Sequence, residues 1–291
     1  MLNLFRLVVV FSVFIFGVTF GHYKYPPFSL LKSVKDYFYE DGYRKIDERF
    51  EICNLPELKT VPEGAHAFIG HAYGAPREGN EKDYLASNVL KFIQKNKTKL
   101  KSVSFTGDVF AIPSLEKWKR LGKELTEPQK IFIAPGNHDV ARLDSLDVFG
   151  ISSFGRDYPF LERLDHTQVV YEDSIASDWL VSSETLGLVN SLASRNVIVA
   201  RHNIPVVELK HLANSTAGMS SKLPGINEFV EKFRADVSYT WLIGDSGAFP
   251  QLPRISCFQY SNHTFIANGV GGIIGDSVVI FIGDKFYRYE L

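Results

Sequence analysis

The sequence predicts an α/β (α+β) fold for the chain after residue 62, and three observations support this prediction. Five short apolar runs rich in β-branched or aromatic residues have the composition of buried strands: 67–69, 102–105, 130–134, 196–200 and 239–243. A segment with helical periodicity lies between each pair of consecutive runs. Near the C-terminus, further runs at 264–267, 278–282 and 286–289 follow one another closely, as antiparallel strands joined by tight turns do.

Each of the four helical segments has an apolar stripe. Residues 81–95 carry theirs at helical spacing, on Leu85, Val89, Phe92 and Ile93. Residues 114–125 begin with Ser114, a residue type that caps helices. The other two stripes lie within residues 186–192 and 226–233. We expect all four helices to cover a sheet.

The N-terminus predicts a separate targeting segment. Residues 7–20 are almost entirely apolar and follow Arg6, which is typical of a signal peptide or an uncleaved signal anchor. The block is short for a membrane span of roughly 20 residues. We therefore expect three parts: a signal peptide or signal anchor at 1–21, a juxtamembrane connector at 22–62 and a folded domain at 63–291, outside the cytoplasm. The domain would be membrane-anchored or secreted.

Composition excludes several classes of protein. The 291 residues are 45% hydrophobic and 22% charged, which is enough apolar content for a core. A formal net charge of -1 argues against nucleic acid as a partner. Only two cysteines occur, Cys53 and Cys257, which excludes a thiolate zinc site. A single bridge between them is possible.

A turn with metal-binding residue types follows each of the five apolar runs. These turns are Gly70-His71-Ala72-Tyr73-Gly74, Thr106-Gly107-Asp108, Gly136-Asn137-His138-Asp139, Arg201-His202-Asn203 and Gly244-Asp245-Ser246-Gly247. When helices connect the strands of a sheet, the strand ends gather at one edge, where ligands bind. Because every turn carries His, Asp or Asn, we expect one shared site.

The order of these motifs resembles the calcineurin-like metallophosphoesterase superfamily. Its pattern runs Asp-x-His, Gly-Asp, Gly-Asn-His-Asp/Glu, a lone His and Gly-His-x-His, each at a strand end. Three blocks of this chain match directly: Gly107-Asp108, Gly136-Asn137-His138-Asp139 and the lone His202. The resemblance covers roughly residues 65–284. It implies a four-layer αββα sandwich of two mixed β-sheets flanked by helices, with a two-metal site at one end.

The same resemblance implies roles for the matching residues. Asp108 would bridge the two metals, and Asn137 and His202 would ligate the second metal. His138 would lie beside the phosphate as proton donor or transition-state stabiliser. Asp139 either orients His138 or is an ordinary turn residue.

Two blocks depart from the superfamily pattern. His71-Ala72-Tyr73 stands where Asp-x-His is expected, and Gly244-Asp245-Ser246-Gly247 stands where Gly-His-x-His is expected. One carboxylate is lost at His71 and one is gained at Asp245, so the number of carboxylates is unchanged. Gly247 provides no side chain.

The expected ligands therefore divide unequally between the two metals. The second metal keeps four: Asp108, Asn137, His202 and Asp245. The first keeps Asp108 and His71, with Tyr73 as a ligand or, alternatively, as a hydrogen-bond donor to phosphate. We expect divalent Mn, Fe or Zn, with one strong site and a weaker second site.

Two functions fit these motifs. The first is an exported or membrane-anchored phosphoesterase, in which metal-bound hydroxide attacks a phosphorylated small molecule, glycan or lipid and His138 assists the leaving oxygen. The alternative is a catalytically impaired relative that serves as a binding or assembly protein of the cell envelope. A metal-dependent enzyme of another reaction type is a third possibility.

Several other polar residues have simpler expected roles. Four histidines are expected at the surface: His66, His166, His211 and His263. Arg201 could meet an anionic substrate or lie on a surface loop, and Asn203 is expected to shape its loop.

Overall fold

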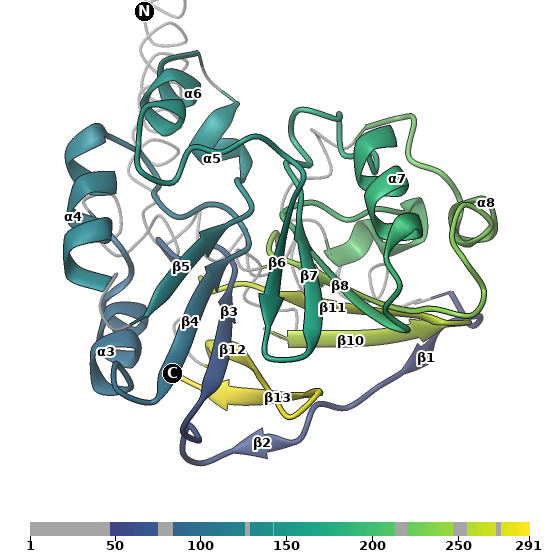
Figure 1. The fold of residues 1–291 in the computed structure, drawn as a ribbon, viewed down its shortest axis with the longest axis horizontal. Helices are drawn as coiled ribbons and strands as arrows, with labels where there is room; N and C mark the ends of the chain where they lie inside the picture. Colours follow the sequence, from purple (N-terminus) through teal and green to yellow (C-terminus); the bar gives the residue numbers. More distant parts are fainter. Residues whose placement is uncertain are drawn as a thin grey trace, which may run out of the picture. The chain divides into compact units, whose positions relative to one another are not determined.

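The structure, a computed structural model, contains two mixed β-sheets with helices, as the α/β prediction requires (Figure 1). It describes residues 47–74, 84–125, 129–141, 143–212, 220–246, 255–271 and 275–291. These residues belong to the compact unit Asp47–Leu291. The predicted signal segment 1–21 and residues 22–46 of the predicted connector lie outside the described residues. Among the helices in the described ranges, none combines the length and the apolar character needed to cross a membrane.

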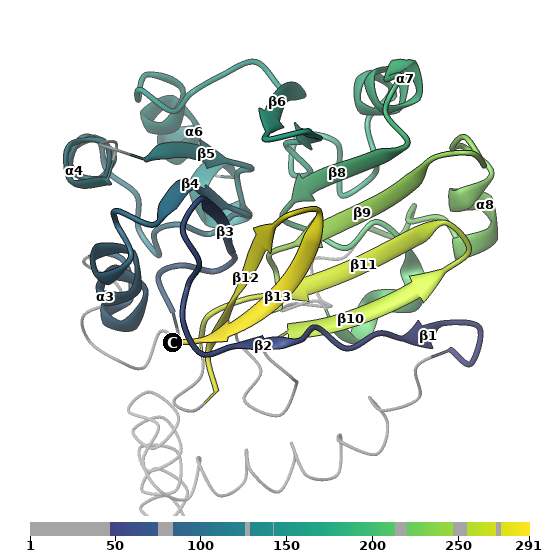
Figure 2. The same ribbon diagram turned by 60° about the horizontal axis from the view of Figure 1, so that its bottom comes forward.

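The first sheet has six strands in the order β2-β13-β12-β3-β4-β5 (Figure 2). Their bounds are β2 Glu57–Leu58, β3 Ala65–Ile69, β4 Leu100–Phe105, β5 Lys130–Ile133, β12 Ser277–Ile282 and β13 Lys285–Glu290. Strands β3, β4 and β5 run parallel, and β12 pairs antiparallel with both β3 and β13. The predicted C-terminal hairpin is therefore confirmed.

The second sheet has seven strands in the order β1-β10-β11-β9-β8-β7-β6. Their bounds are β1 Glu51–Ile52, β6 Phe160–Leu164, β7 Thr167–Tyr171, β8 Asn196–Arg201, β9 Ser238–Ile243, β10 Ile255–Tyr260 and β11 His263–Asn268. Strands β7, β8, β9 and β11 are parallel. Strand β11, expected to be antiparallel, has an antiparallel neighbour only in β10.

Helices pack against both sheets. They are α3 Ser87–Lys95, α4 Leu115–Leu125, α5 Asn137–Val140, α6 Leu143–Gly150, α7 Ser183–Ser191 and α8 Ile226–Val230, with a 3-10 helix at Val207–Leu212. Of these, α3, α4, α7 and α8 overlap the four predicted segments, whereas α5 and α6 were not predicted. Helices α3 and α4 share a core with β3, β4 and β5. On the other sheet, α8 places the Phe229 ring against Trp241 of β9. Figure 1 shows these two helix groups beside different sheets.

Side-chain alternation on β3 shows how the layers are held together. Ala67 and Ile69 face the core shared with α3 and α4, whereas Phe68 lies in the core between the two sheets. Val279 and Phe281 of β12 join Phe68 there. Full burial of such a side chain contributes about 1.5–3 kcal/mol. Because successive side chains of a strand point to opposite faces, the six-stranded sheet packs on one face against α3 and α4 and on the other against the second sheet.

The described part of the predicted connector contributes edge strands. Strand β1 pairs with β10, and β2 pairs with β13, so residues 51–58 extend both sheets. Next to β1, Cys53 forms a disulfide with Cys257 of β10, with 5.0 Å between the Cα atoms. The possible bridge is thus present in the structure, and residues 47–58 are part of the compact unit.

Candidate metal centre

The ends of five strands meet in one place: β3, β4 and β5, which are parallel in one sheet, and β8 and β9, which are parallel in the other. After β3, the His71 N–H donates to the Gly107 carbonyl that follows β4, at 3.0 Å. After β9, the Asp245 N–H donates to the His202 carbonyl that follows β8, at 3.0 Å. The side-chain contacts described below join these two pairs. The loops with the predicted ligands therefore form one cluster.

Asp108 lies at the centre of this cluster. Its Oδ1 atom is 3.5 Å from His202 Nε2, and its Oδ2 atom is 3.6 Å from His71 Nε2. The side chain is only 2% exposed, and Oδ1 also accepts the backbone N–H of His138 at 3.0 Å. Burial alone would raise the pKa of Asp108, but His202, His71 and His138 outweigh it and hold this pKa below its usual value. The two oxygens thus face different imidazoles, as a bridging carboxylate requires.

Backbone carbonyls lie beside the Nδ1 atom of all three imidazoles and so favour the same tautomer in each. The Nδ1 atom of His71 lies 3.1 Å from Val270 O, that of His138 lies 2.8 Å from Ala111 O, and that of His202 lies 3.1 Å from Thr106 O. A carbonyl only accepts hydrogen bonds, so each Nδ1 carries the proton and, in the neutral ring, each Nε2 carries a lone pair. Histidines that bind metals are held by their second nitrogen in this way.

Several acceptor atoms meet around His202 Nε2. Asn137 Oδ1 lies 3.1 Å away, and Asp245 Oδ1 lies 3.8 Å away, in addition to Asp108 Oδ1. Four acceptors facing one another in a buried site repel unless a positive charge lies among them. Burial lowers the pKa of His202, yet Asp108 and Asp245 outweigh it and raise this pKa overall. The site therefore attracts either a proton on Nε2 or a cation.

The spacing of these atoms fits a cation. Ligands that each lie about 2.1 Å from one metal ion are about 3.0–3.4 Å apart in octahedral or tetrahedral geometry. The separations of 3.1, 3.5 and 3.8 Å around His202 Nε2 are close to this range. In the described residues, no group of three or more His, Cys, Asp or Glu side chains could hold a metal ion. The fit rests on the pairwise distances and on the Asn137 amide.

The His71 side has fewer acceptors. Burial lowers the pKa of His71 to about 4, so the ring is neutral at pH 7 with Nε2 directed towards Asp108. His71 and Asp108 both adopt left-handed backbone conformations, with φ of 52° and 54°. Such conformations cost about 1–3 kcal/mol for residues other than glycine and cluster at functional sites. Gly247, expected on this side, lies outside the described residues.

Two motif glycines allow the loops to approach one another. A Cβ atom on Gly107 would lie 2.3 Å from the His202 ring, and one on Gly136 would lie 2.3 Å from Asp108 Oδ1. Gly107 also has φ of +94°, which residues with side chains rarely adopt. The glycines are therefore required for the packing of the ligand loops.

Tyr73 and His138 form a pair at the open side of the cluster. The Tyr73 hydroxyl lies 3.4 Å from His138 Nε2 and its ring centroid lies 4.3 Å from that of His71. Because His138 Nδ1 donates to Ala111, the Tyr73 hydroxyl is the donor in the contact with Nε2. The His138 side chain is 38% exposed, in contrast to the buried His71 and His202.

Asp139 has a different position from the one expected for an orienting carboxylate. Its Oδ2 atom accepts the Gly136 N–H at 3.0 Å, and its Oδ1 atom accepts the Val109 N–H at 3.2 Å. Burial and the Asp108 charge raise the pKa of Asp139 to about 7. The contact that orients the His138 ring comes from Ala111 O, so of the two roles expected for Asp139 its contacts fit that of a turn residue. Asp139 joins the loops after β4 and β5.

Sequence reasoning missed a buried polar layer behind the ligands. Asn203 is fully buried, and its Nδ2 donates to Asp245 Oδ2 at 3.5 Å. Arg201, expected at a surface or a substrate, is also fully buried and forms a 2.8 Å ion pair with Glu172. His66 and His263 are buried as well, which corrects their expected surface positions. These four residues lie on strands β3, β8 and β11 or just after β8, and this position was the sequence signal that could have predicted their burial.

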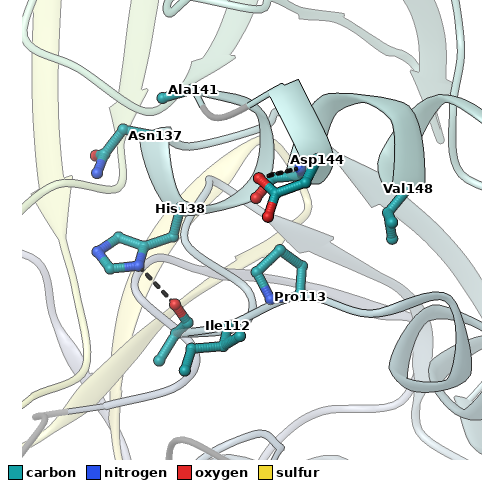
Figure 3. Close-up of a pocket in the computed structure, with 9 residues that line it drawn as sticks. Ile112, Pro113, Asn137, His138, Ala141, Asp144 and Val148 are labelled. Carbon is teal, nitrogen blue, oxygen red and sulfur yellow. Dashed lines mark hydrogen bonds between the residues drawn. The ribbon is translucent and has the colours of Figure 1, made fainter.

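A pocket of about 300 Å³ opens beside His138 (Figure 3). Its lining combines apolar and polar side chains: Ala111, Ile112, Pro113, Asn137, His138, Ala141, Asp144, Ser145 and Val148. Figure 3 shows the His138 ring at one end, with Ile112 and Pro113 below the space and Asp144 across from it. Two predicted site residues, Asn137 and His138, thus belong to both the cluster around Asp108 and the pocket.

Comparisons with known proteins add no functional assignment: no protein-family model matches the sequence, and no curated protein is significantly similar to it.

Proposed function

We propose that this chain is a metal-dependent phosphoesterase related to the calcineurin-like superfamily. The observation that carries this proposal is the position of Asp108, whose two carboxylate oxygens face His202 Nε2 and His71 Nε2 separately. Two packed mixed sheets with helices beside each are also what the sandwich of that superfamily would require. Export of the domain is part of the proposal, supported by the Cys53–Cys257 disulfide, because such bonds persist in oxidising compartments.

The donor set divides into a stronger and a weaker half. Asp108, Asn137, His202 and Asp245 would hold one divalent cation, with oxygen and nitrogen ligands suited to Mn, Fe or Zn. Asp108 and His71 would hold a second cation with fewer protein ligands. Bound cations would supply positive charge for the phosphate and a more acidic water molecule as nucleophile.

The protein itself positions the proton donor. His138 has its ring fixed by Ala111 O, and its exposed side chain opens onto the pocket. With a proton on Nε2, it would donate to the leaving oxygen of the ester. The Tyr73 hydroxyl, 3.4 Å from that atom, would hold Nε2 in place when the ring is neutral. Tyr73 therefore supports the proton donor in this proposal and is not needed as a ligand.

Metal analysis combined with phosphoester hydrolysis tests the proposal. Full-length protein would be supplemented with Mn, Fe and Zn, and bound metal would be measured together with hydrolysis of methyl phosphate and phenyl phosphate. Asp108→Asn should lose both metal and activity, because the central carboxylate charge is removed. Asp178→Asn, an exposed site at 58%, is the matched control and should lose neither. Wild-type protein that binds no metal would contradict the proposal.

A further inference from the structure

We propose that the pocket beside His138 binds the alcohol portion of the phosphoester and selects alcohols that carry a hydroxyl or ammonium donor on an apolar body. This inference rests on the proposed function, since it takes the phosphate to lie at Asn137 and His138. Both residues line the pocket. In Figure 3 the His138 ring forms one end of the pocket, and its Nε2 atom lies on the side of the ring away from Asp144. An ester with its phosphate at Asn137 and His138 therefore reaches the pocket by extending its alcohol past the ring.

One wall of the pocket is apolar and unusually exposed. Ile112 is 59% exposed, although large aliphatic side chains are usually buried. Pro113 and Val148 lie on the same pocket. An organic group that packs against Ile112 would remove this apolar surface from water, which favours binding by about 25 cal/mol per Å².

The wall is connected to the proton donor through the backbone. Ile112 directly follows Ala111, whose carbonyl accepts the hydrogen bond from His138 Nδ1 at 2.8 Å. A group that packs on Ile112 is thus in contact with the loop that fixes the imidazole. This link places the alcohol and the proton donor in a fixed relation to each other.

The opposite side of the pocket is polar. Asp144 and Ser145 lie at the start of α6, and Asp144 Oδ1 accepts the Ser145 N–H at 3.0 Å. A carboxylate accepts several hydrogen bonds, so a hydroxyl or ammonium group can bind to it in addition to its contacts within the protein. In Figure 3 the Asp144 carboxylate lies across the space from His138. A donor on the far side of the alcohol would therefore meet a carboxylate oxygen of Asp144.

The pocket also limits the size of the alcohol. A volume of about 300 Å³ is at the small end of the range for ligand sites. A small amino alcohol or one sugar ring fits this volume. These two sources of the same donor chemistry differ in charge, because only the amine is cationic.

Four phosphomonoesters separate the contributions of the pocket in full-length, metal-loaded enzyme. Methyl phosphate has almost no organic group, phenyl phosphate is apolar, phosphoethanolamine carries an ammonium group and glucose 6-phosphate carries hydroxyls. For each ester, kcat/KM of a variant is divided by that of the wild type. The reactivity of the leaving group cancels in this ratio.

Asp144→Asn should lower kcat/KM for phosphoethanolamine about 10- to 100-fold if the natural alcohol is an amine, because a charge-assisted hydrogen bond is lost. If it is a sugar, glucose 6-phosphate should show the larger loss. Ile112→Ser should lower kcat/KM for phenyl phosphate several-fold more than for methyl phosphate. Asp147→Asn, an exposed position on the same helix, is the control and should change none of the ratios.

Equal ratios for all four esters in both Asp144→Asn and Ile112→Ser would overturn the pocket assignment while leaving the phosphoesterase intact. Absence of metal-dependent hydrolysis of every ester by the wild type would instead overturn the proposed function, and the pocket assignment with it. Metal content, measured for each variant, shows that the metal-ligand cluster is unchanged.

Discussion

The imidazole of His71 and the carboxylate of Asp108 lie at the ends of neighbouring parallel strands, with 3.6 Å between Nε2 and Oδ2. The superfamily that this chain resembles has an aspartate at the first of these positions. A neutral ring there avoids a second carboxylate beside a buried one, and Asp245 restores the charge next to His202. The exchange predicts that positions 71 and 245 depend on each other.

We therefore expect His71→Asp to destabilise the metal-free protein, because two buried carboxylates would face each other. In metal titrations the same variant should bind a second cation more tightly than the wild type. Combining it with Asp245→His restores the number of carboxylates and should recover stability. If each single change leaves metal binding and stability unaffected, the charge-balance argument is wrong.

Asn203 should act through Asp245. Asn203→Ala removes the amide that donates to Asp245 Oδ2, so metal affinity should fall about 10- to 100-fold, as with other residues that orient ligands. Calorimetric titration with Mn²⁺ measures this change. The exposed Asn227 provides a control, since Asn227→Ala should leave the affinity unaltered. A similar affinity in both variants would mean that Asn203 only shapes its loop.

The buried Arg201–Glu172 pair should be important for stability. Glu172→Gln leaves the Arg201 guanidinium buried without its counter-charge, which should cost about 3–5 kcal/mol of unfolding free energy. The Arg156–Glu162 pair is partly exposed, so Glu162→Gln should cost less than about 1 kcal/mol. Urea unfolding of both variants gives the comparison. Equal losses would show that burial of the pair has no consequence.

His263 predicts a loss of stability in mild acid. Burial lowers its pKa to about 4, and Trp241 Nε1 donates to its Nδ1 at 3.0 Å, so the folded state favours the neutral ring. Between pH 6.5 and 4, His263 is protonated in the unfolded chain but remains neutral in the folded chain. Stability is complete above pH 6.5 and should fall by about 3 kcal/mol towards pH 4. His263→Phe should flatten this part of the profile, measured by urea unfolding at several pH values. An unchanged slope would exclude His263 as its source.

The disulfide should contribute to stability through the unfolded chain. Cys53 and Cys257 are 204 residues apart, and closing such a long loop is worth about 2–5 kcal/mol. Replacing both cysteines by alanine should lower Tm by several degrees, measured by calorimetry. Wild-type protein measured before and after reduction of the disulfide provides a second comparison. Identical melting curves with and without the bond would contradict the prediction.

Much of the fold could be predicted because its strands are short, apolar and regularly separated. Strands β6 and β7 were missed: β6 lies at a sheet edge, and Glu162 and Arg163 interrupt its apolar pattern. The burial of His263 was also unpredictable, since it depends on the Phe229 and Phe233 rings that pack over the strand from elsewhere in the chain.

The site divides in the same way. Parallel strands bring their ends together, so the cluster around Asp108 followed from the order of the turns. The contact between Ala111 O and His138 did not, because a backbone carbonyl has no signature in the sequence. Asn203 and Arg201 were assigned to loops because their partners, Asp245 and Glu172, are distant in sequence. Local patterns predict which side chains converge, and long-range contacts decide which of them orient the others.

The Cys53–Cys257 bond also has a mechanical consequence. Strands β1 and β2 are two residues long, and by hydrogen bonds alone they would peel from their sheets under a modest pull on the chain before Asp47. The Cys53–Cys257 bond lies six residues after Asp47. It transfers that load directly to β10, the first strand of the β10–β11 hairpin. Residues 47–52 can therefore straighten under tension, and beyond them the load enters the seven-stranded sheet through β10 and its neighbour β11.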